Sequence, residues 1–439
     1  MRYKKLIQQV NDVLKQDFNQ SDFYDRVAAS LFLFNLVRKY SIQLNNCDNN
    51  EFIKVVLNKT KDMISYESSL YKDLTVVGLN DFDFGTLTAL FSLYGELDLL
   101  GLKGFLDEYF EDASSKNIDQ NTSLDSIVNL SKEILSISEN SSVLDLCSGY
   151  GRFLSNIKNT VDLTGIEINH TVRIVSKINF YFSNNIDNEI YPKILEGDAL
   201  TFDFNNKKYD YIFCEAPLGL KLSPRFVDKM AENSFFPFIS NTMSSAWLFV
   251  DQTLKALKEN GKAVIVINNA PLYKQSDYEY RCSLAISGHI EMVIGLSEKL
   301  LSNTNIPINL LVLNKSKKNL SEIKFIDASG VFVEGRRFNT LIKENISNIM
   351  EMIKASSRFI DVGELEFNMY NLNPRNYESY IQVVNPIRIE DITTDVFRGV
   401  QINSKVLDKI VTKSEYTYKL LRLSDIDVYN VDLEKIGRA

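Results

Sequence analysis

Three acidic residues, Asp145, Glu167 and Asp198, follow short apolar segments of the kind that form buried strands. In an open α/β sheet, the carboxyl ends of neighbouring strands line one crevice, and ligands bind there. A carboxylate in such a crevice accepts hydrogen bonds from an amine or from the hydroxyls of a ribose. Three acids at successive strand ends therefore fit one ligand that carries adenosine.

A segment with two glycines directly follows the first of these acids. It runs Leu146-Cys147-Ser148-Gly149-Tyr150-Gly151 and leads into the start of a helix. Because glycine has no side chain, the backbone at these positions can pass close to a ligand. Turn glycines beside solvated acids are the plainer alternative. Glu167, however, follows the loop at about the spacing of the ribose-binding acid in dinucleotide folds.

The chemistry of this loop distinguishes between two adenosine-bearing cofactors, a nicotinamide dinucleotide and S-adenosylmethionine. The loop lacks the G-x-G-x-x-G form that receives a pyrophosphate, and the charge of Asp145 would repel phosphate. A nicotinamide dinucleotide stays possible on geometry alone. S-adenosylmethionine has an amine and a sulfonium but no phosphate, so the acidic loop favours it. The residues expected to contact the cofactor are Asp145, Cys147, Gly149, Gly151, Glu167, Ile168, Asp198 and Ala199.

Short apolar segments alternate with helix-length connections from about residue 121 onward. This alternation predicts a mostly parallel sheet that helices cover on both faces. The expected fold class is therefore α/β, with a doubly wound, Rossmann-like sheet. The expected strands are 142–146, 161–167, 191–198, 209–214, 262–267, 290–296 and 310–314, and helices are expected at 125–135 and 340–357.

Residues 1–120 have a different pattern. Apolar residues recur there at helical spacing and proline is absent, which predicts a helical N-terminal domain. Nothing in this stretch has the residue types or spacing of a catalytic site. We interpret it as a bundle or a docking surface.

Composition limits the possible functions. The 439 residues suffice for two or three domains, and 45% hydrophobic residues leave enough for a sizeable core. Four scattered cysteines and two histidines indicate neither a disulfide framework nor a metal centre. Because the sequence has neither a long apolar run nor a signal-peptide core, we expect a cytoplasmic protein that contacts no membrane.

The net charge of −8 argues against a protein whose whole surface binds nucleic acid. A local basic groove stays possible, and a solvated face is an equal alternative. The candidate residues for such a groove are Lys207, Lys208, Lys221, Arg225 and Lys229.

The glycine loop also carries a family resemblance. The chain resembles the amino-methylating DNA methyltransferases, and most closely the modification subunit of type I restriction–modification systems. The loop of that family usually has the sequence Asp-Pro-Ala-Cys-Gly-Ser-Gly, and residues 145–151 keep its acid and both glycines. Further stretches similar to that subunit are Ile294–Leu296, Asn305–Pro307, Leu311–Lys315, Phe325–Ser329, Gly335–Thr340 and Tyr370–Tyr377.

This resemblance covers roughly residues 120–380 and implies a class I S-adenosylmethionine-dependent methyltransferase fold. It also implies methyl transfer to the exocyclic amine of an adenine that is flipped out of double-stranded DNA. The implied partners are the DNA and the specificity and restriction subunits or fused equivalents.

The catalytic motif of this family is Asn, Asp or Ser, followed by Pro-Pro and an aromatic residue. Its first side chain and a prolyl carbonyl accept hydrogen bonds from the target amine, and the aromatic ring stacks on the base. The resemblance places Glu215-Ala216-Pro217-Leu218 there. It therefore assigns Glu215, Pro217 and Leu218 to the flipped base, although the longer side chain of glutamate, an alanine and a leucine depart from the pattern.

These departures leave alternatives to an active DNA methyltransferase. One is a catalytically silent, DNA-binding scaffold of a restriction or phage-defence assembly, and another is methylation of a different substrate. A second departure lies upstream, where the family has Phe-Tyr-Thr-Pro and this chain has Asn121-Thr122-Ser123-Leu124.

The C-terminal segment has a separate resemblance. Residues 392–401 and 420–426 are similar to the opening of a target-recognition domain of the specificity subunit. We expect a helical domain over 1–120, a methyltransferase domain over 121–385, and over 386–439 the start of a target-recognition-like domain that is cut short.

Overall fold

The structure is a computed structural model, and the chain forms two compact units, Met1–Ser379 and Tyr380–Ala439. The structure describes residues 2–19, 22–43, 49–59, 61–77, 82–116, 125–157, 162–183, 191–301, 305–316, 322–335, 338–356, 358–377, 419–420 and 437–438. In the second unit, strands β10 (Lys419–Leu420) and β11 (Gly437–Arg438) pair antiparallel. The remainder of the expected recognition-like segment, and the departure at 121–124, lie outside the described residues.

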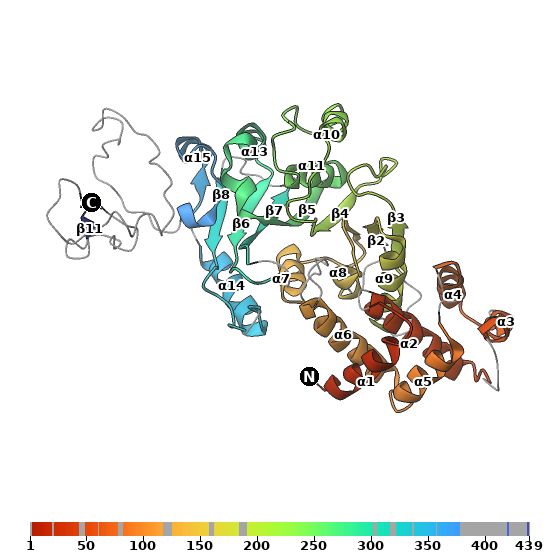
Figure 1. The fold of residues 1–439 in the computed structure, drawn as a ribbon. Coiled ribbons are helices and arrows are strands. Elements are labelled where there is room, and N and C mark those ends of the chain that lie inside the picture. The colour runs from red at the N-terminus through yellow and green to blue at the C-terminus, as the bar shows by residue number, and fades with distance from the viewer. Residues whose placement is uncertain are drawn as a thin grey trace. The chain divides into compact units, whose positions relative to one another are not determined.

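The N-terminal part of the first unit is helical, as the sequence predicts (Figure 1). Its helices are α1 (Lys4–Leu14), α2 (Phe23–Lys39), α3 (Asn49–Lys59), α4 (Ser65–Val77), α5 (Phe84–Tyr94) and α6 (Leu99–Lys116). Helix α2 is apolar on nearly all sides and is buried in the middle of this bundle. At the start of α5, the carboxylate of Asp83 accepts hydrogen bonds from the amides of Gly85 and Thr86 and caps the helix.

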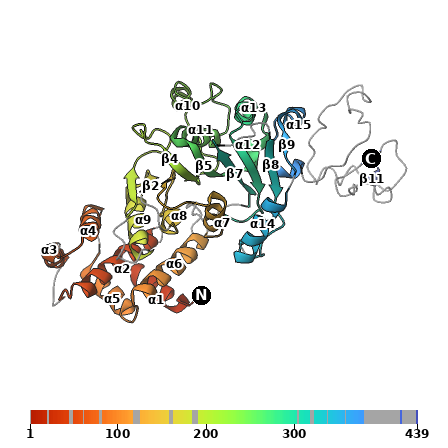
Figure 2. The same ribbon diagram turned by 180° about the vertical axis from the view of Figure 1, so that it is seen from behind.

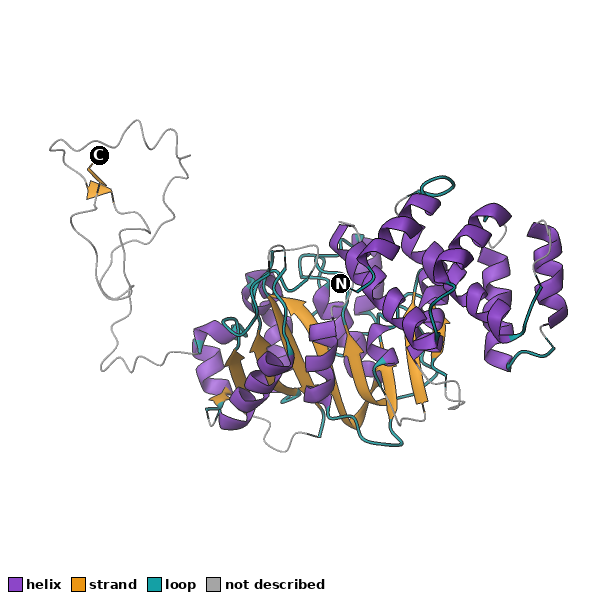
Figure 3. Ribbon diagram, turned by 90° about the horizontal axis from the view of Figure 1, so that it is seen from below, coloured by secondary structure: helices purple, strands orange, loops and turns teal. Residues whose placement is uncertain are grey.

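A nine-stranded sheet follows, and Figure 3 shows its strands side by side. The strands are β1 (Ser142–Asp145), β2 (Asp162–Glu167), β3 (Lys193–Glu196), β4 (Tyr209–Cys214), β5 (Leu257–Asn268), β6 (Ile290–Gly295), β7 (Ile308–Asn314), β8 (Glu322–Asp327) and β9 (Ile360–Asp361). Their order is β3-β2-β1-β4-β5-β7-β6-β8-β9. The first five strands of that order run parallel, and β7 runs antiparallel to both of its neighbours. The mostly parallel α/β sheet is therefore confirmed.

Helices cover both faces of this sheet. They are α7 (Asp125–Leu135), α8 (Arg152–Ser155), α9 (His170–Ser183), α10 (Pro224–Ala231), α11 (Ala246–Ala256), α12 (Asn269–Tyr273), α13 (Tyr278–Ile286), α14 (Lys343–Ala355) and α15 (Val362–Phe367). In Figures 1 and 2, α11 and α13 lie on one side of the sheet, and α7 and α14 lie on the other. Leu144 packs in the cluster that contains α11, and Val143 packs in the cluster that contains α7. Successive residues of a strand thus fill opposite cores, which makes the sheet doubly wound.

The sheet extends beyond the strands that the sequence pattern predicts. The expected series ends at 310–314, but β8 and β9 continue the edge, and β5 begins at Leu257 rather than at 262. Only Ile323 and Ile326 of β8 are buried, which makes its apolar signal weak. No described helix combines the length and the apolar character that a bilayer crossing requires.

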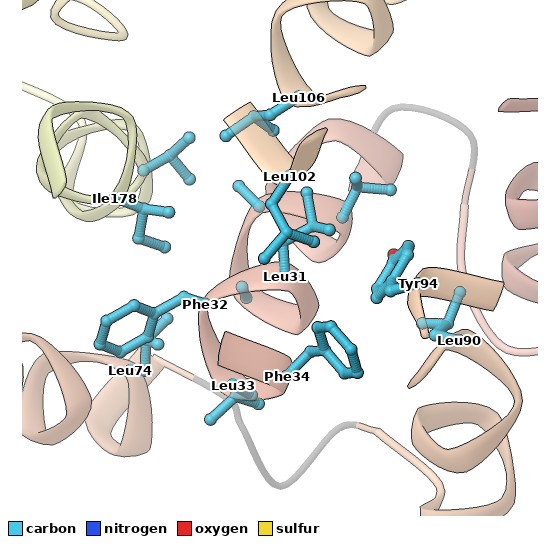
Figure 4. Close-up of a cluster of buried hydrophobic side chains, with 14 of the residues drawn as sticks. Leu31, Phe32, Leu33, Phe34, Leu74, Leu90, Tyr94, Leu102, Leu106 and Ile178 are labelled. Atoms are coloured by element: carbon cyan, nitrogen blue, oxygen red, sulfur yellow. The ribbon is translucent and has the colours of Figure 1, made fainter. Parts of the chain in front are cut away.

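One hydrophobic core joins the N-terminal helices to α9. Figure 4 shows Ile178 of α9 on the same cluster as Leu31 and Phe32 of α2 and Leu102 of α6. On its other side, α9 contacts β2 and β3. Helix α9 is therefore the element through which the helical bundle reaches the sheet.

Candidate active site

Asp145 is the last residue of β1, which lies between β2 and β4 at the centre of the parallel strands. It is only 2% exposed, and its Oδ1 atom has no hydrogen-bond partner among the described residues. Burial, followed by the nearby charge of Glu215, raises the pKa of Asp145 well above its usual value. A cationic group or a hydrogen-bond donor of a bound ligand would stabilise the ionised form of such a buried carboxylate.

The glycine loop crosses the carboxyl end of β1. Gly149 and Gly151 have φ angles of 49° and 76°, in the left-handed region that favours glycine. A Cβ atom on Gly151 would lie 3.1 Å from the Cβ of Ser176 on α9, whereas a Cβ on Gly149 would meet nothing within 4 Å. The first glycine thus faces open space, and the second allows α9 to pack closely.

Glu167 ends β2 and ties two loops together. Its carboxylate accepts hydrogen bonds from the amide of Gly149 at 2.9 Å and from the amide of Asn169 at 2.7 Å. Burial raises the pKa of Glu167, and the backbone donors partly offset this increase. The amide of Ile168 is a third backbone donor, which leaves this carboxylate able to accept a further hydrogen bond.

The other predicted cofactor residues lie along the same edge, because β3, β2 and β1 are consecutive in the sheet. Ile168 follows Glu167 directly and is 67% exposed, which is unusual for a large apolar side chain. Asp198 is half-buried after β3 and accepts a hydrogen bond from the amide of Leu200, while Ala199 is buried. The structure therefore places the predicted set at the carboxyl ends of three neighbouring strands.

Glu215 follows β4, the other neighbour of β1, and both of its carboxylate oxygens are buried. The thiols of Cys147 and Cys214 are hydrogen-bonded to each other beside it. This bond, together with burial, raises the pKa of Cys147 well above its usual value. Cys147 is therefore a protonated thiol rather than a nucleophile.

A cavity of about 340 Å³ adjoins the segment after β4. Pro217 and Leu218 line one side of it, and Phe249, Asn268 and Lys274 line others. Pro217 is exposed, whereas Leu218 is half-buried and also packs against the core that contains α7. Of the three residues that the resemblance assigns to the base, Pro217 and Leu218 therefore line the cavity, and Glu215 lies next to Asp145 instead.

The candidate basic residues divide into two groups. Lys207 is ion-paired with Asp162 at the start of β2, and Lys208 donates to the carbonyl of Lys255, so both lie at the edge opposite to Asp145. This location excludes Lys207 and Lys208 from a groove at the site. Three further residues follow β4, are exposed, and make no ion pair within the described part of the chain: Lys221, Arg225 and Lys229.

The sequence pattern missed the side chains that hold the glycine loop. Asn179 of α9 donates a hydrogen bond to the carbonyl of Tyr150 at 2.8 Å, and Tyr24 of α2 donates to Asn179 at 3.1 Å. The one available signal was a bulky aromatic residue between two glycines. In the described residues, no cluster of three or more His, Cys, Asp or Glu side chains is suited to a metal ion.

The order of the parallel strands, the antiparallel β7 and the glycine loop after β1 define the class I methyltransferase fold. The sequence matches the N-6 DNA Methylase family over residues 104–385. The chain belongs to this family of DNA methylases.

Curated relatives are consistent with this membership. The chain is 27% identical over 401 residues to the type I restriction enzyme MjaVII methylase subunit of Methanocaldococcus jannaschii, with 81% of this chain and 68% of that protein covered. It is 28% identical over 238 residues to the MpnII methylase subunit of Mycoplasma pneumoniae, with 48% of this chain and 43% of that protein covered.

Solved structures show the same fold. The methyltransferase subunit of a type I restriction–modification system from Streptococcus thermophilus has a TM-score of 0.67 at 18% identity, over 84% of this chain and 97% of that one. A modification subunit of a putative type I restriction enzyme from Vibrio vulnificus has a TM-score of 0.59 at 14% identity, over 85% and 98% of the two chains.

Proposed function

We propose that the chain is the methyltransferase subunit of a type I restriction–modification system and methylates the exocyclic amine of an adenine flipped out of double-stranded DNA. The observation that carries this proposal is the adjacency of two sites. Glu215, whose charge acts on Asp145, directly precedes Ala216 and Pro217, which line the cavity. A methyl donor and a flipped base need such neighbouring sites.

The crevice suits S-adenosylmethionine. The buried carboxylate of Asp145 binds the ammonium group of the methionine end, which gives its Oδ1 atom a hydrogen-bond donor. Glu167 accepts hydrogen bonds from the ribose hydroxyls, and Asp198 accepts one from the exocyclic amine of the cofactor's adenine. The exposed side chain of Ile168 gives the adenine ring an apolar surface.

The remaining cofactor residues act through the backbone and through shape. Gly149 leaves the space above the loop open, and Gly151 lets the chain turn toward α9. Cys147 and Ala199 complete the wall of the crevice beside the acids.

The residues after β4 would orient the target amine. The carboxylate of Glu215 and the carbonyl of Pro217 accept hydrogen bonds from its two N–H groups, and Leu218 packs against the base. Bound S-adenosylmethionine supplies the electrophilic methyl group. The carboxylate of Glu215 takes up the proton that the amine loses, so the alkylated nitrogen ends neutral.

The proposed partners follow from the same assignment. The exposed residues Lys221, Arg225 and Lys229 follow the catalytic segment and would contact DNA phosphates. Specificity and restriction subunits, or fused equivalents, would complete the assembly, and its location would be cytoplasmic.

A second candidate function is a catalytically silent DNA-binding scaffold of a restriction or phage-defence assembly. Leu218 favours it, because an aliphatic side chain cannot stack on a base as a ring does. Base–aromatic stacking contributes about 1–3 kcal/mol.

Calorimetric titration of S-adenosylmethionine into the full chain tests the proposal first, with Asp145→Asn as the variant. The matched control is Asp162→Asn, which removes a carboxylate at the opposite edge of the sheet. Binding that Asp145→Asn abolishes and Asp162→Asn preserves supports the cofactor site. Transfer of labelled methyl groups to adenine in DNA then separates an enzyme from a silent scaffold. A folded parent that binds no S-adenosylmethionine would refute the cofactor assignment.

A further inference from the structure

The side chain of Tyr150 points away from the crevice and into the helical bundle. It is 6% exposed, and its ring centroid lies 4.7 Å from that of Tyr24 on α2 and 5.6 Å from that of Phe110 on α6. Its hydroxyl lies beside the carboxylate of Asp25, the neighbour of Tyr24. The residue between the two loop glycines thus contacts two N-terminal helices, α2 and α6.

The backbone of the same residue is held from a second direction. Asn179 donates to the carbonyl oxygen of Tyr150 at 2.8 Å, and the hydroxyl of Tyr24 donates to the amide oxygen of Asn179 at 3.1 Å. Both contacts are buried, so water does not replace them readily. Tyr24 therefore contacts the side chain of Tyr150 through its ring, and it is linked to the backbone of Tyr150 through Asn179.

Helix α9, which supplies Asn179, is fixed to the bundle by its own contacts. The hydroxyl of Tyr181 donates to Glu67 of α4 at 2.6 Å and accepts from Asn35 of α2 at 2.7 Å. Lys177 pairs with Asp73 of α4 at 2.7 Å. The position of α9, and with it that of Asn179, is set jointly by the bundle and the sheet.

These contacts act on the part of the loop that the cofactor would touch. The conformation at Gly149 and Gly151 needs positive φ on both sides of Tyr150, and glycine alone fixes no single conformation. An anchored aromatic residue between two glycines removes that freedom. The amide of Gly149 is also the donor that binds Glu167, so a displaced Tyr150 disturbs both cofactor-binding loops.

We propose that the N-terminal helices form part of the cofactor site, with Tyr24, Asp25 and Asn179 as positioning residues that fix the glycine loop through Tyr150. This inference rests on the proposed function for its effect on the cofactor, whereas the coupling of bundle and loop does not depend on any ligand. The helical region then controls cofactor affinity rather than serving only as a docking surface.

Hydrogen exchange on the full chain, without ligand, tests the coupling. Tyr24→Phe removes only the hydroxyl that binds Asn179, and Asn179→Ala removes both bonds. We expect faster exchange of the loop amides at 146–152 in both variants and unchanged exchange in β5. The control is Tyr94→Phe, which removes a buried hydroxyl bonded to Ser30 at 3.0 Å inside the same bundle. Unchanged loop exchange in both variants, or an equal increase in the control, overturns the proposal.

Titration of S-adenosylmethionine into the same proteins tests the consequence. Removal of the Asn179 bond to Tyr150 should weaken binding about tenfold, the fold-change that corresponds to one buried hydrogen bond. Asp25→Asn, which keeps a hydrogen-bonding group for Tyr150, should restore the affinity that Asp25→Ala reduces. Faster loop exchange with unchanged affinity overturns the positioning role. If loop exchange becomes faster in the variants but the parent binds no cofactor, the coupling of bundle and loop is supported and the proposed function is refuted instead.

Discussion

Asp145 ends β1 and Glu215 directly follows β4, the neighbouring strand, and the negative charge of Glu215 acts on the buried carboxylate of Asp145. Two acids in such proximity do not both ionise easily. A cationic ligand between them relieves the repulsion, so the site should prefer a sulfonium and an ammonium to neutral groups. The carboxylate of Glu215 therefore affects the charge around Asp145.

The first prediction concerns the pH dependence of cofactor binding. Burial and the charge of Glu215 raise the pKa of Asp145, and a cation binds the ionised carboxylate. Affinity for S-adenosylmethionine should therefore rise with pH through the titration of Asp145. Glu215→Gln removes one cause of the increase in pKa, so it should move this transition to lower pH. Calorimetry over a pH series measures the shift. A transition at the same pH in both proteins would show that Glu215 does not act on Asp145.

The second prediction is that Asp145→Asn stabilises the fold while it abolishes cofactor binding. Because the pKa of Asp145 is higher in the folded chain than in the unfolded one, its contribution to stability is full at low pH. That contribution is lost as pH rises toward the raised pKa. At neutral pH the substitution should increase the free energy of unfolding by about 1–3 kcal/mol.

Urea unfolding at acidic and neutral pH measures this effect. The gain should be smaller at acidic pH, where Asp145 is protonated in both states. Asp162→Asn, which breaks the partly exposed ion pair with Lys207, should lower the free energy of unfolding by about 1 kcal/mol or less at neutral pH. A decrease of similar size in Asp145→Asn would contradict the prediction.

The third prediction concerns the contact between the helical bundle and α9. Glu67 is fully buried and accepts hydrogen bonds from Lys39, Tyr40 and Tyr181. Glu67→Ala leaves the buried hydroxyl of Tyr181 without its acceptor and breaks the contacts of the partly exposed Lys39 and Tyr40, so it should cost about 1–3 kcal/mol of unfolding free energy. Asp12→Ala breaks an exposed pair with Lys15 and should cost about 1 kcal/mol at most. Equal decreases in the two variants, measured by urea unfolding, would refute the structural role of Glu67.

The sequence predicted those parts of the fold that depend on neighbouring residues. Strand β1 and Asp145 could be placed because an apolar run ending in an acid and a glycine loop is a local pattern. Strand β8 was missed because four of its six residues are only partly buried. Local pattern therefore suffices for strands that are buried along most of their length, such as β1, and fails for strands that are weakly buried.

The contacts that position the loop depend on residues far apart in the chain. Tyr24, Asn179 and Tyr150 are ordinary core residue types, and only their arrangement in space gives them a common purpose. Likewise, the positive charge of Lys207 is typical of a DNA-binding residue, and only the structure shows that Lys207 pairs with Asp162. Such pairings follow from tertiary packing, which residue type and spacing do not encode.

The fourth prediction concerns the residue that borders the cavity. Leu218 lies at the opening of a space of about 340 Å³, so a larger ring has room there. Leu218→Phe should raise the rate of methyl transfer to adenine by about 5- to 150-fold, the range that corresponds to base stacking. Single-turnover transfer from labelled S-adenosylmethionine to DNA measures the change. Leu220→Phe, which lines the same cavity, is the control and should have little effect. A rate that Leu218→Phe leaves unchanged, with cofactor binding intact, would remove Leu218 from the base site.

The fifth prediction concerns the exposed basic residues after β4. If Lys221, Arg225 and Lys229 contact phosphates, changing all three to alanine should weaken binding to double-stranded DNA at low salt. The slope of log affinity against log salt should fall by about 0.9 for each phosphate that the variant no longer neutralises. Fluorescence anisotropy over a salt series measures both quantities. Lys207→Ala should leave affinity and slope unchanged, because Lys207 pairs with Asp162 at the opposite edge. A slope that responds to Lys207→Ala and not to the triple change would place the DNA on that opposite edge instead.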